Sequence, residues 1–435
     1  MSYEVTMRLF AREAFLPGGW APDVAFELAA DGTILTVEPG TEPGGAEVID
    51  GPVMPGMPNL HSHAFQRAMA GTAERRGVGG DDFWGWRQTM YALANRLDPD
   101  ALRALAADVY RAMVAAGYTA VAEFHYLHRD ANGAWYADRA IMARALVEAA
   151  REAGIAICLL PALYAHADIG GAPLREEQRR FAIDVDDVLE IARTLRADYA
   201  RDPDVVVGAC AHSLRAVTPE QLRALLAGSP SDVPVHVHAA EQLREVEAVR
   251  AALGAAPVAW LLDNFAVDAR WCLVHATHLE DAERDALARS GAVAGLCPTT
   301  EANLGDGLFP LHPYLAARGA IGVGSDSNVS LAPAEELRWL EYGQRLTQRR
   351  RIVAALDPGA SAGETLYARA AAGGAQACGF AAGALAPGNR ADLIVLDDTI
   401  PPLAGAPPSE LVDRYVFASD RAQPLRVMIR GRWRT

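Results

Sequence analysis

Histidine and carboxylate side chains gather at the ends of short apolar segments, in a pattern typical of a metal site. His61 and His63 are two residues apart, so on a strand both imidazoles point to the same side. Further candidates end three later apolar segments: His238 with Glu241, His275, and Asp326. Three imidazoles and one carboxylate suit Zn²⁺, with Fe²⁺ as the alternative. We therefore predict one divalent metal with the ligands His61, His63, His238 and Asp326.

The neighbours of these ligands indicate what a bound metal would do. Zinc lowers the pKa of a bound water to roughly 7. Asp326 can take the proton of that water, and His275 can hold the attacking oxygen in position. Glu241 lies three residues past a ligand and can pass a proton to a leaving nitrogen. The set predicts hydrolysis at a C–N centre, with Glu241, His275 and Asp326 as catalytic residues.

Lysine is absent from the chain, and this narrows the chemistry. All 40 residues counted as Lys plus Arg are arginine. A Schiff-base lysine and a carboxylated lysine that bridges two metals are therefore impossible. The second exclusion favours a single metal.

Histidines at strand ends are more often hydrogen-bonding residues than ligands. We expect that structural role for His125, His128, His166 and His312. His236 lies inside its apolar segment, and we expect it to pack in the barrel or to support the ligands. His278 lies in the turn after His275, where a helix cap or a surface position is expected.

Bulk composition excludes several classes of protein. The chain has 435 residues, of which 51% are hydrophobic and 22% charged, and its formal net charge is −15. An acidic chain without a basic stripe binds nucleic acid and anionic membranes poorly, so we expect neither partner. Five scattered cysteines in apolar runs indicate free thiols in a reducing compartment. No apolar stretch approaches the roughly 18 residues of a membrane span, and we expect a cytoplasmic protein.

Strands alternating with helices must position the polar residues. Between residues 52 and 349, apolar strand-like segments alternate with segments of helical periodicity, which is typical of βα units around a parallel sheet. The eight expected strands are 52–57, 118–124, 155–162, 204–211, 233–238, 271–275, 291–296 and 320–324. Eight units predict an α/β fold of the TIM-type (β/α)8 barrel class, in which all strand C-termini converge on one face.

Both ends of the chain lack the alternation of strands and helices and have instead a residue pattern typical of short β-strands. Residues 3–10 and 24–49 alternate between apolar and polar types around turn signals, and short β-like runs recur at 391–396, 414–417 and 426–429. We predict a small β domain made of 1–51 and 385–435, and a barrel domain over 52–384.

The motifs resemble those of the amidohydrolase superfamily, in particular its mononuclear deaminase branch. The resemblance covers essentially the whole chain, and Gly383–Asp397 is similar to that family's return to its small β domain. Within the branch, the chain is most similar to the subfamily of formimidoylglutamate deiminases. The segments that carry this likeness are Met54–Gly71, Phe83–Tyr91, Glu123–Tyr126, Ala211–Val217 and Cys297–Gly307.

The resemblance implies a substrate and its contacts. It implies hydrolysis of N-formimino-L-glutamate to N-formyl-L-glutamate and ammonia in histidine degradation, by a homodimer. The implied substrate contacts are Gln66, Arg87, Tyr126, His212 and Arg215. This substrate carries two carboxylates, and the planar guanidinium of Arg suits such groups.

The sequence leaves two alternatives open. The same site could serve another deaminase, acting on a nucleobase, a triazine or a guanidine. A barrel that binds metal without catalysis would require the loss of Glu241 or Asp326, and both are present. Two segments are candidates to close over the substrate, 71–97 and 299–312.

Overall fold

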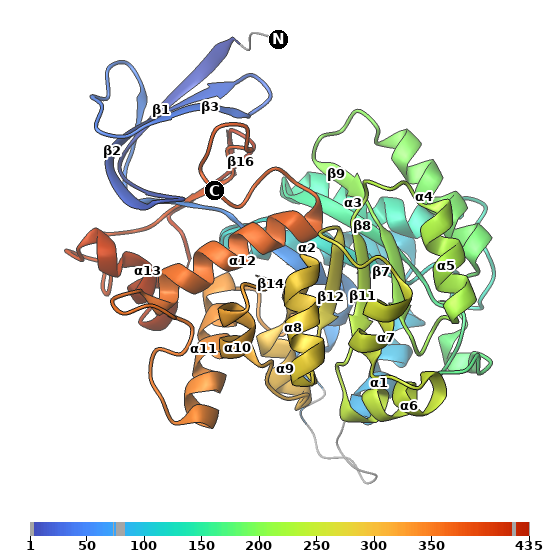
Figure 1. The fold of residues 1–435 in the computed structure, drawn as a ribbon. Helices are drawn as coiled ribbons and strands as arrows, with labels where there is room; N and C mark the ends of the chain where they lie inside the picture. Colours follow the sequence, from blue (N-terminus) through green and yellow to red (C-terminus); the bar gives the residue numbers. More distant parts are fainter. Residues whose placement is uncertain (1–3, 73, 75–82, 420–422, 435) are drawn as a thin grey trace.

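The computed structural model describes residues 4–72, 74, 83–419 and 423–434 of the chain. Figure 1 shows a barrel wrapped by helices, with a second sheet beside it where the blue N-terminal strands meet the red C-terminal segment. None of the helices in these ranges has the length and apolar character that a bilayer crossing requires.

The barrel is a parallel sheet in which neighbours follow the chain order. Its strands are β6 (Met57–Ser62), β7 (Tyr118–His125), β8 (Ala156–Leu163), β10 (Ala209–Ser213), β11 (Val235–Ala239), β12 (Trp271–His275), β13 (Val293–Leu296) and β14 (Ala320–Val323), with β9 (Val205–Val207) paired to β8. A parallel bridge between Ser62 and Asp326 brings the last strand back to the first. The predicted (β/α)8 barrel is confirmed.

Helices cover the outside of the barrel. They are α1 (Phe83–Ala94), α2 (Pro99–Ala115), α3 (Ile141–Ala153), α4 (Val185–Asp198), α5 (Pro219–Gly228), α6 (Leu243–Leu253), α7 (Pro257–Asn264), α8 (Asp281–Ser290), α9 (Pro298–Leu304), α10 (Leu311–Ala316), α11 (Pro333–Gln348), α12 (Ala362–Cys378) and α13 (Pro408–Phe417), with the short turns η1 (Ala64–Met69) and η2 (Glu176–Gln178).

Local sequence explains these elements. Every residue of β6, β7 and β8 is buried, as expected for parallel strands covered on both faces. The side chain of Asp98 caps α2 by accepting from the amide of Ala101, and Thr218 forms a capping box with Gln221 at α5. Gly154 ends α3 at φ 73°, a left-handed conformation that glycine adopts without strain.

The second sheet joins the two ends of the chain. Its strands run in the order β17 (Arg432–Trp433), β16 (Arg426–Ile429), β15 (Leu393–Val395), β5 (Val53–Pro55), β1 (Val5–Leu16), β2 (Gly19–Ala29) and β3 (Ile34–Glu38), and β4 (Glu47–Ile49) pairs with β1. The junction between the chain ends is antiparallel, with Pro55 opposite Leu393. Buried residues from both ends form a separate apolar core in this sheet.

Three of the strands expected from the sequence need correction, two of them inside or next to the barrel. The segment 52–57 is not the first barrel strand, because β5 belongs to the second sheet and the chain crosses to the barrel at Gly56. A Cβ at Gly56 would lie 2.2 Å from the side chain of Thr119, so the crossing needs glycine. The expected strand 204–211 is divided at Gly208 into β9 and β10.

The segment 414–417 is not a strand but the end of α13. Pro408 starts this helix at its first position, and Glu410 pairs with Arg414 one turn later at 2.6 Å. Leu411 and Tyr415 face the core together, four residues apart. Period-four burial therefore outweighs the β-like composition of the last residues.

Candidate active site

The predicted metal ligands lie where the first and last barrel strands meet. His61 belongs to β6, His63 follows it directly, and Asp326 follows β14. The amide of Asp326 donates to the carbonyl of His61 at 2.9 Å, and the amide of His63 donates to the carbonyl of Asp326 at 2.9 Å. The backbone contacts that close the barrel thus bring residues 265 positions apart into register.

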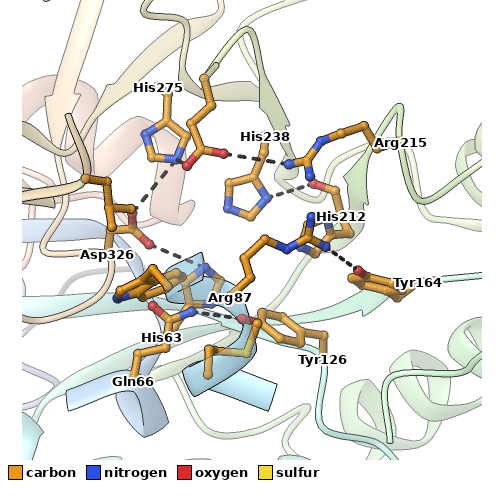
Figure 2. Close-up of a pocket in the computed structure, with 14 residues that line it drawn as sticks. His63, Gln66, Arg87, Tyr126, Tyr164, His212, Arg215, His238, His275 and Asp326 are labelled. Carbon is orange, nitrogen blue, oxygen red and sulfur yellow. Dashed lines mark hydrogen bonds and ion pairs between the residues drawn. The ribbon is translucent and has the colours of Figure 1, made fainter. Parts of the chain in front are cut away.

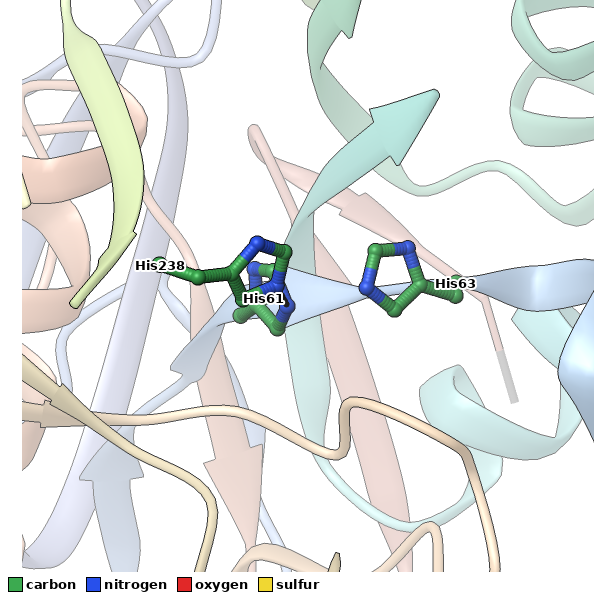
Figure 3. Close-up of side chains that lie close together, drawn as sticks. All are labelled: His61, His63 and His238. Carbon is green, nitrogen blue, oxygen red and sulfur yellow. Dashed lines mark hydrogen bonds between the residues drawn. The ribbon is translucent and has the colours of Figure 1, made fainter. Parts of the chain in front are cut away.

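Three imidazoles and one carboxylate converge at this seam. His238 comes from β11, and its Nε2 lies 3.1 Å from Nε2 of His61. Oδ1 of Asp326 lies 3.4 Å from Nε2 of both His61 and His63. One ligand atom of each histidine falls within 4.8 Å of the others, and Figure 3 shows the three rings grouped together.

Hydrogen bonds on the far side of two rings make this group suitable for a cation. Nδ1 of His63 donates to the carbonyl of Phe124 at 2.9 Å, and Nδ1 of His238 donates to the carbonyl of His212 at 2.7 Å. A carbonyl only accepts, so Nδ1 carries the hydrogen and each Nε2 points its lone pair at the others. Burial lowers the pKa of His61 to about 3 and also lowers the pKa of His63 and His238. Neutral imidazoles beside a carboxylate fit one divalent metal.

Asp326 is the anionic member of the group. Burial opposes its ionisation, but the hydrogen bond with His61 and the neighbouring imidazoles outweigh burial, so the pKa of Asp326 lies below its ordinary value. Its backbone is left-handed at φ 43°, as is that of His275 at φ 70°. Such conformations are costly for residues other than glycine and occur often at functional sites.

His275 and Glu241 lie next to the ligands. Nε2 of His275 is 3.8 Å from Oε1 of Glu241 and 3.9 Å from Oδ2 of Asp326. Burial works against a charged His275, yet the charge of Glu241 and a hydrogen bond with Glu301 raise its pKa to about 10. Burial raises the pKa of Glu241, against the charges of His275 and Arg215. A proton can therefore be stored beside the ligands.

A guanidinium completes the group around Glu241. Arg215 follows β10, and its Nη2 lies 3.7 Å from Oε2 of Glu241. Burial and the charges of Arg215 and Arg87 hold the pKa of His212 well below its ordinary value. His212 is therefore neutral and can hydrogen-bond a ligand without repelling Arg215.

These side chains line one pocket, shown in Figure 2. The space within it, measured out to the open mouth, is about 490 Å³. All predicted site residues except His61 line it: His63, Gln66, Arg87, Tyr126, His212, Arg215, His238, Glu241, His275 and Asp326. The sequence therefore predicted ten residues, from seven separate places in the chain, that share one cavity.

The far wall of the pocket holds the remaining predicted contacts. Arg87 comes from α1, and its Nη2 donates to Oη of Tyr164 at 3.2 Å. Nε2 of Gln66 donates to Oη of Tyr126 at 2.9 Å. Oε1 of Gln66 is buried and accepts no hydrogen bond from the described part of the chain. That oxygen is suited to accept from an N–H group of a ligand.

Four of the other histidines bind backbone carbonyls instead, whereas Nε2 of His166 is buried without a hydrogen-bond partner in the described part of the chain. Rings bonded in this way are His128 to Ala162, His236 to Ala377, His278 to Asp306 and His312 to Val353. Nε2 of His236 lies 2.8 Å from its carbonyl on α12. His236 therefore packs against α12 and is not a ligand.

Tyr164 and Glu301 are two residues at the site whose polar contacts were not predicted. Tyr164 lines the pocket and holds Arg87, and it lies just past the predicted strand 155–162. Glu301 contacts His275 from α9 and lies inside the segment 297–307 that carried the family likeness. In both cases the segment that contains the residue could be recognised in the sequence. The contact itself could not, because it depends on how segments distant in the chain pack together.

Of the two segments expected to close over the site, 71–97 lies partly outside the described residues. Its part in α1 contributes Trp86, Arg87 and Met90 to the pocket. The segment 299–312 contributes Leu304 from α9. Both segments therefore border the cavity.

Comparison with known proteins identifies relatives over the whole chain. Residues 53–434 match the model of the amidohydrolase family, and residues 6–50 match the N-terminal domain of the formimidoylglutamate deiminase HutF. The formimidoylglutamate deiminase of Pseudomonas aeruginosa is 52% identical, over 98% of this chain and 94% of that protein.

Solved structures share the fold. An amidohydrolase from Brucella melitensis has a TM-score of 0.93 at 44% identity, covering 98% of this chain and 94% of that one. An adenosine deaminase from Xanthomonas campestris has a TM-score of 0.80 at 21% identity, covering 99% and 92%. The second likeness is one of fold alone.

Proposed function

The chain belongs to the amidohydrolase family and within it to the formimidoylglutamate deiminases, and on this basis we propose that its pocket hydrolyses N-formimino-L-glutamate to N-formyl-L-glutamate and ammonia. The protein is a hydrolase that acts on a C–N bond outside peptides. The reaction belongs to histidine degradation.

One observation carries the choice of substrate. Two guanidinium groups, Arg87 and Arg215, line the same pocket as the histidines and carboxylates. They stand in a chain of formal net charge −15, so local arginines must attract an anionic substrate. Two arginines match two carboxylates, and Oε1 of Gln66 can accept from the cationic formimino group.

A metal would be held by His61, His63, His238 and Asp326. We propose a single divalent ion, zinc, with ferrous iron as the alternative. When bound, such an ion lowers the pKa of a coordinated water to roughly 7.

The chain's own groups then move the protons. Asp326, which is ionised, accepts the proton that the attacking water loses, at a carboxylate oxygen. The water oxygen bonds to the formimino carbon, and the bond from that carbon to the terminal nitrogen breaks. Glu241 delivers a proton to the departing nitrogen, which leaves as ammonia, and takes back the remaining proton of the added water as the formyl carbonyl forms. Nε2 of His275 lies within 4 Å of both carboxylates and can steady the charge that develops between them.

Product analysis tests this assignment. Purified enzyme incubated with N-formimino-L-glutamate should release one ammonia for each N-formyl-L-glutamate found by mass spectrometry. Formamide and free glutamate would show cleavage of the other C–N bond and contradict the proposal. Guanine and cytosine serve as comparison substrates, because a nucleobase deaminase with this site would prefer them.

Location and assembly are further proposals. All five cysteines are buried free thiols, which supports a reducing compartment, and we place the enzyme in the cytoplasm. We also propose a homodimer that binds small dicarboxylates and neither nucleic acid nor membranes. Light scattering coupled to size exclusion would give the mass of the particle.

A further inference from the structure

Glu301 contacts His275 on the side of the ring that faces away from the pocket. Oε1 of Glu301 lies 3.2 Å from Nδ1 of His275. Both residues are buried, with 4% and 1% of their surface exposed. Glu301 does not line the pocket, so it can influence a substrate only through another residue.

Glu301 is itself held firmly in place. Its Oε1 also accepts from the amide of Cys297 at 2.9 Å, at the start of α9. The same helix is fixed by Thr299, whose amide and hydroxyl both donate to the carboxylate of Glu336, at 2.9 and 2.6 Å. The hydroxyl of Thr300 contacts Ser327, next to Asp326, at 3.0 Å. Helix α9 therefore connects the end of β12 to the loop after β14.

The contact determines how the imidazole of His275 is presented. A carboxylate accepts hydrogen bonds and donates none, so Nδ1 of His275 must carry a hydrogen. Nε2 then faces the pocket, 3.8 Å from Glu241 and 3.9 Å from Asp326. A ring turned about its axis would lose this placement between the two carboxylates that handle protons.

We propose that Glu301 is a positioning residue, which fixes the orientation and the Nδ1 hydrogen of His275 and so acts on hydrolysis only through that ring. The inference rests on the proposed function of the pocket. Helix α9 thereby has a role in the reaction, although the carboxylate of Glu301 does not line the substrate pocket.

A double-mutant cycle tests the proposal on the full-length metal-loaded enzyme. E301A should lower kcat for ammonia release by roughly 10- to 100-fold, the scale seen when a residue that orients a metal-ligating histidine is removed, with a smaller change in KM. In the His275→Gln background the same substitution should change kcat by less than about threefold. An equal loss in both backgrounds, or no loss in the first, would overturn the proposal.

Two further variants separate this role from simple support of the helix. E301Q keeps an oxygen that can accept both from the amide of Cys297 and from Nδ1 of His275, so it should retain most of the wild-type kcat. A loss in E301Q as large as that in E301A would contradict the role of this acceptor. E336Q is the matched control, because Glu336 holds α9 through Thr299 without contacting His275. We expect any effect of E336Q on kcat to be equal with and without His275, while its Tm falls.

A readout without substrate separates this inference from the proposed function. In ¹H–¹⁵N spectra of ¹⁵N-histidine-labelled protein, the Nδ1 hydrogen of His275 is identified by its loss in His275→Gln. The signal should be protected from exchange in the wild type and lost in E301A. Its retention in E301A would overturn the role of Glu301, whereas absence of ammonia release by the wild type would count against the substrate alone.

Discussion

The backbone amide of Asp326 donates to the carbonyl of His61 at 2.9 Å, so the last strand of the barrel closes on the first through two predicted metal ligands. Their side chains meet as well, with Nε2 of His61 3.4 Å from Oδ1 of Asp326. The site for the cation and the seam of the barrel are therefore the same place. Binding at one should stabilise the other.

Removal of metal should lower thermal stability together with activity. A ligand that binds only the folded state at 100 to 1,000 times its Kd stabilises by about 2.7–4.1 kcal/mol. We expect chelation to abolish ammonia release and to lower Tm by several degrees, with both restored by one equivalent of zinc per chain. Differential scanning fluorimetry with metal analysis measures this. In H61A added zinc should leave Tm unchanged, and a zinc response like that of the wild type would contradict the assigned ligand.

Replacement of Glu241 by Gln should remove proton delivery to the leaving nitrogen. Glu241 is buried beside His275 and Arg215, and Gln keeps its shape but has no acidic proton to transfer. A positioned acid or base contributes about 10²–10⁴-fold, so we expect kcat to fall by this factor with little change in KM. Steady-state ammonia release measures it, and E247Q, an exposed position on α6, is the control. Unchanged kcat in E241Q would remove Glu241 from the mechanism.

Replacement of Arg215 by Gln should weaken substrate binding more than catalysis. A hydrogen bond to a charged group is worth about 1.5–3 kcal/mol, which corresponds to roughly 10- to 150-fold in affinity. We expect KM for N-formimino-L-glutamate to rise by that factor, and to change little for a formimino compound without carboxylates. R223Q, an exposed position on α5, is the matched control. Equal losses for both substrates would show that Arg215 does not recognise a carboxylate.

Buried neutral histidines should make the fold sensitive to acid. Burial lowers the pKa of His236 from 6.5 to about 4. Between these values the unfolded chain binds more protons, so the free energy of unfolding falls as pH falls through that window and is unaffected above it. The slope contributed by one such group is about 1.4 kcal/mol per pH unit.

Urea unfolding at a series of pH values measures this contribution. His236→Gln keeps a donor for the carbonyl of Ala377 but has no titrating ring. Its unfolding free energy should therefore fall less steeply than that of the wild type between pH 6.5 and 4. Parallel curves for the two proteins would show that His236 is not responsible.

Residues that carry chemistry could be predicted from the sequence because each lies at the end of an apolar strand. In a parallel barrel all such ends share one face, so His61, His238, His275 and Asp326 had to converge once the strands were recognised. Zero lysine also excluded a lysine-bridged pair of metals without any structure.

Contacts made by loops and boundaries between sheets were harder to predict. The carboxylate of Glu301 reaches His275 only because Thr299 and Thr300 fasten α9 against Glu336 and Ser327, a long-range arrangement with no local signal. The change of sheet at Gly56 also escaped prediction, since β5 and β6 form an almost continuous apolar run. The composition of such a run indicates that it is buried, but it does not indicate which sheet each part of the run joins.

The pairing of Pro55 with Leu393 has a consequence for synthesis of the chain. Strands β1 to β5 leave the ribosome early, but Leu393 of β15 follows Pro55 by 338 positions in the chain. At 5–20 residues per second, the edge of β5 waits roughly 17–70 s for its partner. During that time the unpaired edge of an apolar sheet can form hydrogen bonds with other chains and aggregate. During synthesis, the N-terminal strands are therefore the part of this chain that most needs a chaperone, until β15 has been made.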